Sequence, residues 1–225
     1  GILLSANPAT LAKAAMYLKR TTALAETIPA VWLELGNMYQ KLGKEQDELE
    51  AYQNYIRTDP QNAEANKRIG ILLAKKGQLT EAMIYLEIAN TMSPDDPDVM
   101  AALARGYAST NRQNEAIDLL KKAKAKKPDD PEIRFALFDL YQKTGQKGKA
   151  KDEMKELISM KRDNKFLIQY ANACLVTGDL KAAEAAIEDV LATEADNIDV
   201  LMLKAKIQVA NKEYDAALET YKEIS

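Results

Sequence analysis

The chain has 225 residues and a mass of 25.0 kDa, with 31 basic and 34 acidic side chains, one cysteine and no histidine. These counts exclude an imidazole base, the usual ligands of a zinc site and an internal disulfide at Cys174. The net charge of −3 gives no electrostatic reason to expect nucleic acid, and no apolar stretch approaches the roughly 18 residues of a membrane span.

Residues of three types recur at a period of 34. Prolines, glycines and tyrosines keep this step at Pro60, Pro94 and Pro128, at Gly43 and Gly77, and at Tyr107 and Tyr141. Within a period such as residues 63–96, apolar side chains three or four apart predict two amphipathic helices joined by a turn at Gly77. Neither helix can bury its apolar stripe alone, so we expect the pairs to stack on their sequence neighbours.

The predicted repeats follow one another along the whole chain. We expect a partial repeat, mainly its second helix, at 1–28, repeats at 29–62, 63–96, 97–130 and 131–163, a divergent repeat at 164–197, and an incomplete repeat at 198–225. In the last repeat Val200, Leu203 and Ile207 fit one frame, whereas Ala217 and Tyr221 fit a frame shifted by one. Both ends fall inside a repeat, and we therefore expect a stretch of a longer array, or ends that a partner covers.

Acidic and amide side chains stand at the junctions between repeats. One precedes each predicted first helix, at Asn62, Asp96, Asp130, Asp163 and Asn197. An oxygen at this position can accept the free backbone N–H groups of the first helical turn. No loop has the alternating oxygen ligands of an EF-hand, so we interpret these residues as helix caps and not as calcium ligands.

The recurring slots resemble the tetratricopeptide repeat (TPR). The pattern is Trp32-x-x-Leu35-Gly36-x-x-Tyr39, and it returns in later copies, for example as Ile69-Gly70-x-x-Leu73 and Leu103-Ala104-x-x-Tyr107. The resemblance implies an all-α fold, an α-solenoid of about thirteen helices stacked as helix-turn-helix repeats in a right-handed superhelix. Glu48 and Phe138 depart from the pattern, because the family usually has small residues at these slots.

Nothing in the sequence points to catalysis or to a cofactor. Gly145 and Gly148 form a lone glycine pair without the Lys-Ser/Thr of a phosphate loop, and the carboxylates fall mostly at caps and on exposed helix faces. Cys174 and Trp32 lie on predicted buried stripes, and Met202 is interpreted as a core gap-filler. We therefore predict that the chain is not an enzyme and that it carries no cofactor or metal.

The first helices of a stacked array line its concave side, and this face is the predicted binding groove. Ile71, Phe135 and Ile168 could hold apolar anchors, while amide and cationic groups could bond the backbone or acidic side chains of a peptide. The alternative is that each of these side chains is merely solvated. The predicted groove residues are Asn37, Gln40, Lys41, Lys67, Arg68, Ile71, Lys75, Arg105, Phe135, Asp139, Gln142, Ile168, Gln169 and Asn172.

One known kind of groove is not expected here. TPR proteins that bind the terminal carboxylate of heat-shock chaperones use a Lys and an Asn in one repeat, an Asn in the next repeat, and a Lys and an Arg in the third. The corresponding slots here hold Leu33 and Asn37, then Arg68, then Asp98 and Ala102, so only Asn37 matches. We predict that the chain is not a clamp for chaperone C-terminal tails.

Two functions remain open. The first is a non-catalytic scaffold or adaptor that binds a partner peptide or helix of unknown identity in the groove. The second is a structural spacer that self-associates through uncapped ends, as in a bacterial envelope or secretion assembly. Residues 121–165 hold 14 basic and 8 acidic side chains, which suit capping and solubility or, alternatively, an acidic partner or an anionic lipid surface. The compartment stays undecided, because cytoplasm and periplasm both suit a cysteine-poor chain.

Overall fold

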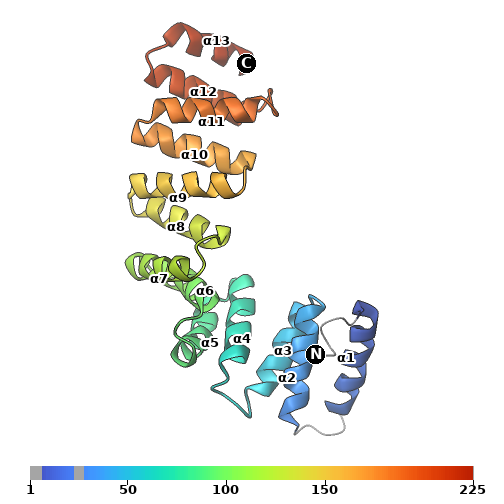
Figure 1. Ribbon diagram of the computed structural model, residues 1–225. Coiled ribbons are helices and arrows are strands. Elements are labelled where there is room, and N and C mark those ends of the chain that lie inside the picture. The colour runs from blue at the N-terminus through green and yellow to red at the C-terminus, as the bar shows by residue number, and fades with distance from the viewer. Residues whose placement is uncertain (1–6, 23–27, 225) are drawn as a thin grey trace. The chain divides into compact units, whose positions relative to one another are not determined.

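The computed structural model describes residues 7–22 and 28–224, and its regular structure in these ranges is all α-helix (Figure 1). No helix in these ranges is both long and apolar enough to cross a membrane. The thirteen helices of the described ranges are α1 (Pro8–Thr22), α2 (Pro29–Lys41), α3 (Glu45–Tyr55), α4 (Ala63–Lys75), α5 (Leu79–Met92), α6 (Pro97–Ser109), α7 (Gln113–Lys126), α8 (Pro131–Lys143), α9 (Lys147–Met160), α10 (Asn164–Thr177), α11 (Leu180–Leu191), α12 (Ile198–Ala210) and α13 (Tyr214–Ile224).

Helices that are neighbours in the sequence pack as pairs. The pairs α2/α3, α4/α5, α8/α9, α10/α11 and α12/α13 each make an extensive contact, and first helices of successive pairs also touch, α4 with α6 and α10 with α12. The chain separates into two compact units, one ending at Leu119 and the other beginning at Leu120, called unit 1 and unit 2. The sequential paired packing confirms the predicted all-α repeat array, whereas the repeat boundaries and the right-handed superhelix stay predictions.

The helix caps are confirmed. In each of the five predicted residues the side-chain oxygen accepts a backbone N–H of the first turn, for example Asn62 Oδ1 from Ala65 at 3.0 Å and Asp96 Oδ1 from Asp98 at 2.9 Å. Asp96 and Asp130 are each followed by a proline, whose missing N–H is not needed at the first helical position. The junction carboxylates thus serve the backbone of their own helices.

The turn inside each pair requires a left-handed backbone. Gly77 has φ +79° and a hypothetical Cβ there would meet nothing within 4 Å, so the conformation itself selects glycine. Two turns take the same conformation without glycine, at Asn111 (φ 63°) and Lys212 (φ 67°). Lysine carries a steric penalty in this region that asparagine reduces by local hydrogen bonding.

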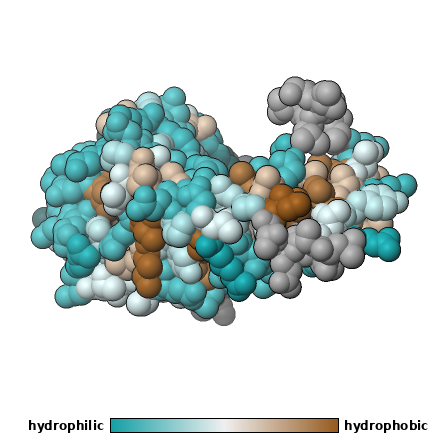
Figure 2. Space-filling model, turned by 90° about the horizontal axis from the view of Figure 1, so that it is seen from below, coloured by the Kyte–Doolittle hydropathy of each residue, from teal (hydrophilic) through white to brown (hydrophobic). Residues whose placement is uncertain are grey.

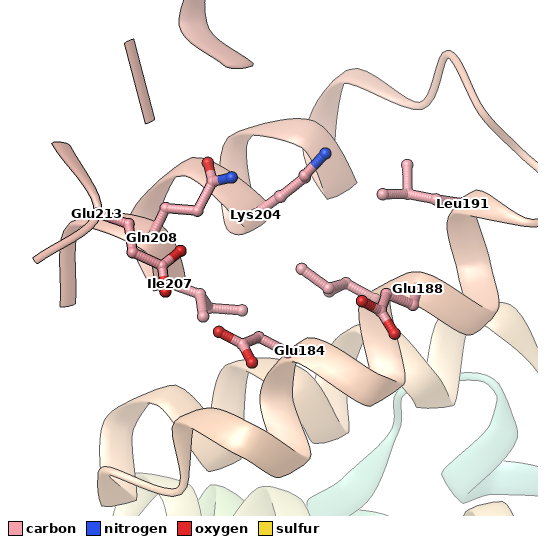
Figure 3. A pocket seen from close by; sticks show the side chains of 8 residues that line it. Glu184, Glu188, Leu191, Lys204, Ile207, Gln208 and Glu213 are labelled. Carbon is pink, nitrogen blue, oxygen red and sulfur yellow. The ribbon is translucent and has the colours of Figure 1, made fainter. Parts of the chain in front are cut away.

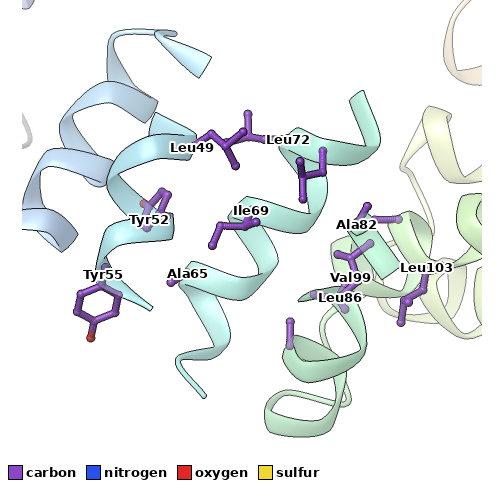
Figure 4. Packing of buried hydrophobic residues seen from close by; sticks show 13 residues of the cluster. Leu49, Tyr52, Tyr55, Ala65, Ile69, Leu72, Ala82, Leu86, Val99 and Leu103 are labelled. Carbon is purple, nitrogen blue, oxygen red and sulfur yellow. The ribbon is translucent and has the colours of Figure 1, made fainter. Parts of the chain in front are cut away.

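The core of unit 1 runs from helix to helix. One cluster of buried residues extends from Leu49 and Tyr52 on α3, through Ile69 and Leu72 on α4, to Leu103 on α6 (Figure 4). Each helix therefore contributes apolar side chains toward both of its neighbours. Trp32, half-buried on α2, packs against this cluster and against the more N-terminal cluster around Leu35, in line with its predicted place on an apolar stripe.

The small slots show how closely paired helices approach. A Cβ on Gly36 would lie 2.8 Å from the Tyr52 ring, and Tyr52 is fully buried. The two predicted departures, Glu48 and Phe138, are also buried. Glu48 forms an ion pair with Arg68, and the Phe138 ring lies 5.8 Å from that of Phe135. Each of these two larger residues thus has a side-chain partner, Arg68 for Glu48 and Phe135 for Phe138.

Polar side chains connect consecutive repeats. Donor and acceptor lie 28 to 30 residues apart in Lys67–Asp96 (3.0 Å), Lys75–Glu45 (2.9 Å) and Lys151–Asp179 (2.9 Å). A surface pair such as Lys75–Glu45 contributes only about 0–1 kcal/mol, so the apolar stripes carry most of the stability.

The last helix exposes an apolar stripe. Ala217 and Thr220 are its buried residues, and the Thr220 hydroxyl donates to Gln208 Oε1 at 2.9 Å. Of the residues that fitted the shifted frame, Ala217 is buried and Tyr221 is 39% exposed. Tyr214 and Leu218 are exposed by 63% and 54%, so three apolar side chains at helical spacing face solvent on α13.

Candidate functional site

The predicted groove residues all lie on first helices of pairs. Eight of them are on α2, α4 and α6, and they form the first-helix face of unit 1. The other six are on α8 and α10, and they form the first-helix face of unit 2 together with equivalent positions on α12. The two faces differ in chemistry and are described in turn.

Three cations of the unit 1 face, Lys67, Arg68 and Lys75, are paired within the array. Lys67 Nζ lies 3.0 Å from Glu64 and 3.0 Å from Asp96. Burial acts to lower the Lys67 pKa, but the hydrogen bonds to these two carboxylates outweigh it and raise the pKa. Lys75 pairs with Glu45 at 2.9 Å. These positive charges are largely neutralised inside unit 1.

Arg68 pairs with a buried carboxylate. Its Nη2 and Nε lie 2.6 Å and 2.7 Å from the same oxygen of Glu48, whose side chain is 2% exposed. Burial raises the pKa of the Glu48 carboxyl above its usual value, and the bond to Arg68 opposes this shift. Arg68 therefore compensates a buried charge that would otherwise be costly.

The remaining unit 1 residues are two amides, one apolar side chain and two cations. Asn37 Oδ1 accepts the hydroxyl of the buried Tyr52 at 2.9 Å, so this amide supports its own repeat. Ile71 is half-buried against the core, whereas Gln40, Lys41 and Arg105 are exposed.

The unit 2 face carries a row of apolar side chains. Phe135 on α8 is 41% exposed, and its ring centroid lies 6.0 Å from that of Phe166 on α10. Ile168, at the equivalent position of α10, is half-buried. Met202 follows 34 residues later on α12, which contacts α10, and is 37% exposed. Phe135, Ile168 and Met202 are called the apolar row.

A row of polar side chains accompanies the apolar row one helical turn further along. Asp139 pairs with Lys143 at 2.7 Å, and Asn172 donates to the Ile168 carbonyl at 3.0 Å. Gln142 and Gln169 are exposed and supply further amide groups.

Sequence reasoning missed part of this face. Met202, interpreted as a core gap-filler, is instead exposed on α12, because the buried side of that helix is already filled by residues such as Leu203 and Ile207. Val176 and Val209, 56% and 43% exposed, were not singled out either. The signal that could have found Met202 is its place one period after Ile168.

Several lysines stand near the end of α7, and some of them have a structural role within unit 2. Lys124 donates to Glu153, a buried carboxylate that also accepts from Arg134 at 3.2 Å. Lys124 and Lys126 stand in the last turn of α7, where cations interact favourably with the negative end of the helix dipole. A docking role for residues 121–165 stays a prediction.

The described residues contain few reactive groups. Cys174 is fully buried, and burial raises the pKa of its thiol, which keeps it protonated and inert. Within the described ranges, no three His, Cys, Asp or Glu side chains are grouped so that they could hold a metal ion. One face of the molecule in Figure 2 is mostly hydrophilic, with scattered apolar side chains.

Helices packed in sequential pairs, with a small-residue slot that recurs along the chain, define a helical-repeat protein. Two models of the tetratricopeptide repeat family match the sequence, one over residues 9–160 and the other over residues 175–225. The chain belongs to the tetratricopeptide repeat family. This family generally mediates protein–protein interactions and is generally non-catalytic.

Solved structures with the same fold have low sequence identity to this chain. A tetratricopeptide repeat protein from Parabacteroides merdae is 20% identical with a TM-score of 0.63, over 96% of this chain and 86% of that one. YrrB, a TPR protein with an unusual peptide-binding site, is 16% identical with a TM-score of 0.71, over 78% and 91%. PilW, a type IV pilus biogenesis factor, is 19% identical with a TM-score of 0.66, over 85% and 89%. A search of curated protein sequences finds no match.

Proposed function

We propose that the chain is a non-catalytic scaffold that binds a protein segment along the first-helix face of unit 2. The observation that carries this proposal is the apolar row, in which Phe135 and Met202 stay exposed by 41% and 37%. Covering exposed apolar area is worth about 25 cal/mol per Å², so a partner with apolar side chains gains most there.

Unit 1 is the weaker candidate for this contact. A peptide carboxylate that approached Lys67 or Arg68 would compete with Asp96, Glu64 or Glu48 for the same donor. Exchanging one ion pair for another yields little net free energy. On unit 2 the equivalent row is the apolar row, which is neutral, so covering its side chains breaks no ion pair that they make.

The unit 2 face also indicates the character of the partner. Asp139, Asn172 and Lys206 occupy equivalent positions beside the apolar row. The first is negatively charged, the second is neutral and the third is positively charged, so the three carry no net charge. A partner segment with two or three apolar anchors and little net charge suits this surface, as an extended peptide or as one face of a helix.

The experiment is a peptide-library selection against the whole chain, followed by affinity measurement on the selected peptides. The double variant Phe135→Ser/Met202→Ser should weaken their binding at least tenfold. Ile84→Ser is the matched control, because Ile84 is 58% exposed on α5, a second helix of unit 1. Circular dichroism checks that each variant is folded. Equal affinity of both variants for apolar peptides would refute the proposal.

A structural spacer that self-associates is the second candidate function. The observation in its favour is the stripe of Tyr214, Leu218 and Tyr221 on α13, which nothing in the described residues covers. Sedimentation velocity between about 1 and 100 μM separates the two functions. For a spacer, the sedimentation coefficient should rise with protein concentration, and Leu218→Glu should abolish this rise. For a scaffold without its partner, the sedimentation coefficient should stay constant.

A further inference from the structure

A cleft of about 420 Å³ opens in unit 2 between α11, α12 and the residue before α13 (Figure 3). Its apolar lining comes from Ile187 and Leu191 on α11 and from Ile207 on α12. Glu184 and Glu188 project from the α11 side, Lys204 and Gln208 lie along α12, and Glu213 stands at one end (Figure 3). The volume is within the range of about 300–1,000 Å³ that is typical of ligand sites.

The floor of the cleft is apolar. Ile187 and Ile207 are almost fully buried, and they form an apolar floor beneath the charged side chains.

The charges of the cleft favour a cation. Three carboxylates and one ammonium group line it. One oxygen of Glu184 accepts from Asn211, which leaves its second oxygen for a ligand. The surrounding sequence has the same sign, because residues 179–225 hold eleven acidic and five basic side chains. Long-range attraction therefore brings cations toward this end of unit 2.

The opposite wall supplies hydrogen-bond donors. Gln208 Oε1 already accepts the Thr220 hydroxyl at 2.9 Å, so the hydrogen-bonding capacity that this side chain offers a ligand is that of its amide N–H donors. Lys204 adds an ammonium group beside it. A ligand that matches both walls carries a cation on an aliphatic stem together with a carbonyl acceptor. A peptide with an arginine or lysine side chain has this combination, whereas a free polyamine lacks the acceptor.

We propose that this cleft binds the cationic side chain of an arginine or lysine in a protein segment. The stem lies on Ile187 and Ile207, the charged head meets Glu184, Glu188 and Glu213, and the backbone carbonyl accepts from Lys204 or Gln208. Arginine is favoured over lysine, because its planar head can engage two carboxylates at once. The cleft acts independently of the apolar row.

The test is an NMR titration of the ¹⁵N-labelled chain with the tripeptide acetyl-Gly-Arg-Gly-amide. The matched ligand replaces arginine by citrulline, which has the same shape without the charge. We expect saturable shifts in α11 and α12 from the arginine peptide and at least tenfold weaker binding of the citrulline peptide. Equal binding of the two peptides, or shifts outside these helices alone, would overturn the proposal.

Variants separate the cleft from general electrostatics. Glu188→Gln/Glu213→Gln should weaken the arginine peptide at least fivefold, whereas Glu219→Gln removes an exposed carboxylate of α13 outside the cleft and should change nothing. Ile207→Tyr places a larger side chain on the floor of the cleft and should fill the cleft and abolish binding. If that variant fails to fold, the glutamine pair still decides the question, because its side chains are exposed.

A third arm distinguishes the source of the cation. We expect spermidine to bind α11 and α12 more weakly than the arginine peptide does. Equal affinity would indicate that the cleft binds a free polyamine, and it would overturn the proposal. Phe135→Ser/Met202→Ser, which changes residues outside the cleft, should bind the arginine peptide normally. A failure of this proposal is thus distinguishable from a failure of binding at the apolar row.

Discussion

The ion pair between Glu48 and Arg68 provides a sharp test of how the repeats of unit 1 are held together. The Glu48 side chain is 2% exposed and the Arg68 side chain 18% exposed, and both Arg68 donors are within 2.7 Å of one carboxylate oxygen. The Arg68→Ala variant removes the cation and leaves the carboxylate buried. Removing one partner of a buried pair destabilises a protein by about 3–5 kcal/mol, and we expect a loss in this range.

The reverse change should be much milder. Glu48→Ala places at this slot the small residue that the repeat pattern usually has, and Arg68 is close enough to the surface for its head to reach water. We expect a loss of at most about 1 kcal/mol. The double variant Glu48→Ala/Arg68→Ala should therefore be more stable than Arg68→Ala alone, because no buried charge remains.

Urea unfolding followed by circular dichroism measures these free energies, and its pH dependence adds a second check. Burial raises the folded-state pKa of Glu48 above the usual 4.5, and losing Arg68 raises it further. The folded state then binds the proton more tightly than the unfolded chain, so the penalty of Arg68→Ala is full above the folded pKa and shrinks as pH falls toward 4.5. A loss below about 1 kcal/mol at pH 8, or no smaller loss at pH 5, would refute this reasoning.

Further predictions concern packing, the turns, the thiol and the groove. Gly36→Ala should destabilise by about 1–2 kcal/mol in urea unfolding, because the new Cβ meets the buried Tyr52 ring, whereas Gly148→Ala, with nothing within 4 Å, should stabilise α9 slightly. Lys212→Gly relieves a left-handed lysine and should raise the free energy of unfolding by about 1 kcal/mol; a decrease would count against the assigned strain. Cys174 should react with a thiol reagent only at the rate of unfolding, and fast labelling of the native chain would contradict its burial. Isothermal titration calorimetry with a chaperone C-terminal peptide should show no binding, and a submicromolar Kd would show that this prediction is wrong.

Sequence alone was sufficient for the features that depend on residues close together in the chain. Helix pairs follow from apolar side chains three or four apart, and caps such as Asn62 and Asp96 follow from an oxygen placed next to the first turn. A period of 34 then requires each pair to pack on the next. These are short-range rules repeated along the chain, and they identify the family without any knowledge of long-range contacts.

The chemistry of the candidate faces was decided only by the tertiary structure. Arg68 and Lys67 are indistinguishable in sequence from free cations, and their partners Glu48 and Asp96 lie 20 and 29 residues away in neighbouring repeats. Whether a charge is available depends on side chains that meet only when repeats stack. The same holds for Met202 and for the space beside Ile207, because exposure and volume are properties of the packed helices and not of any one segment.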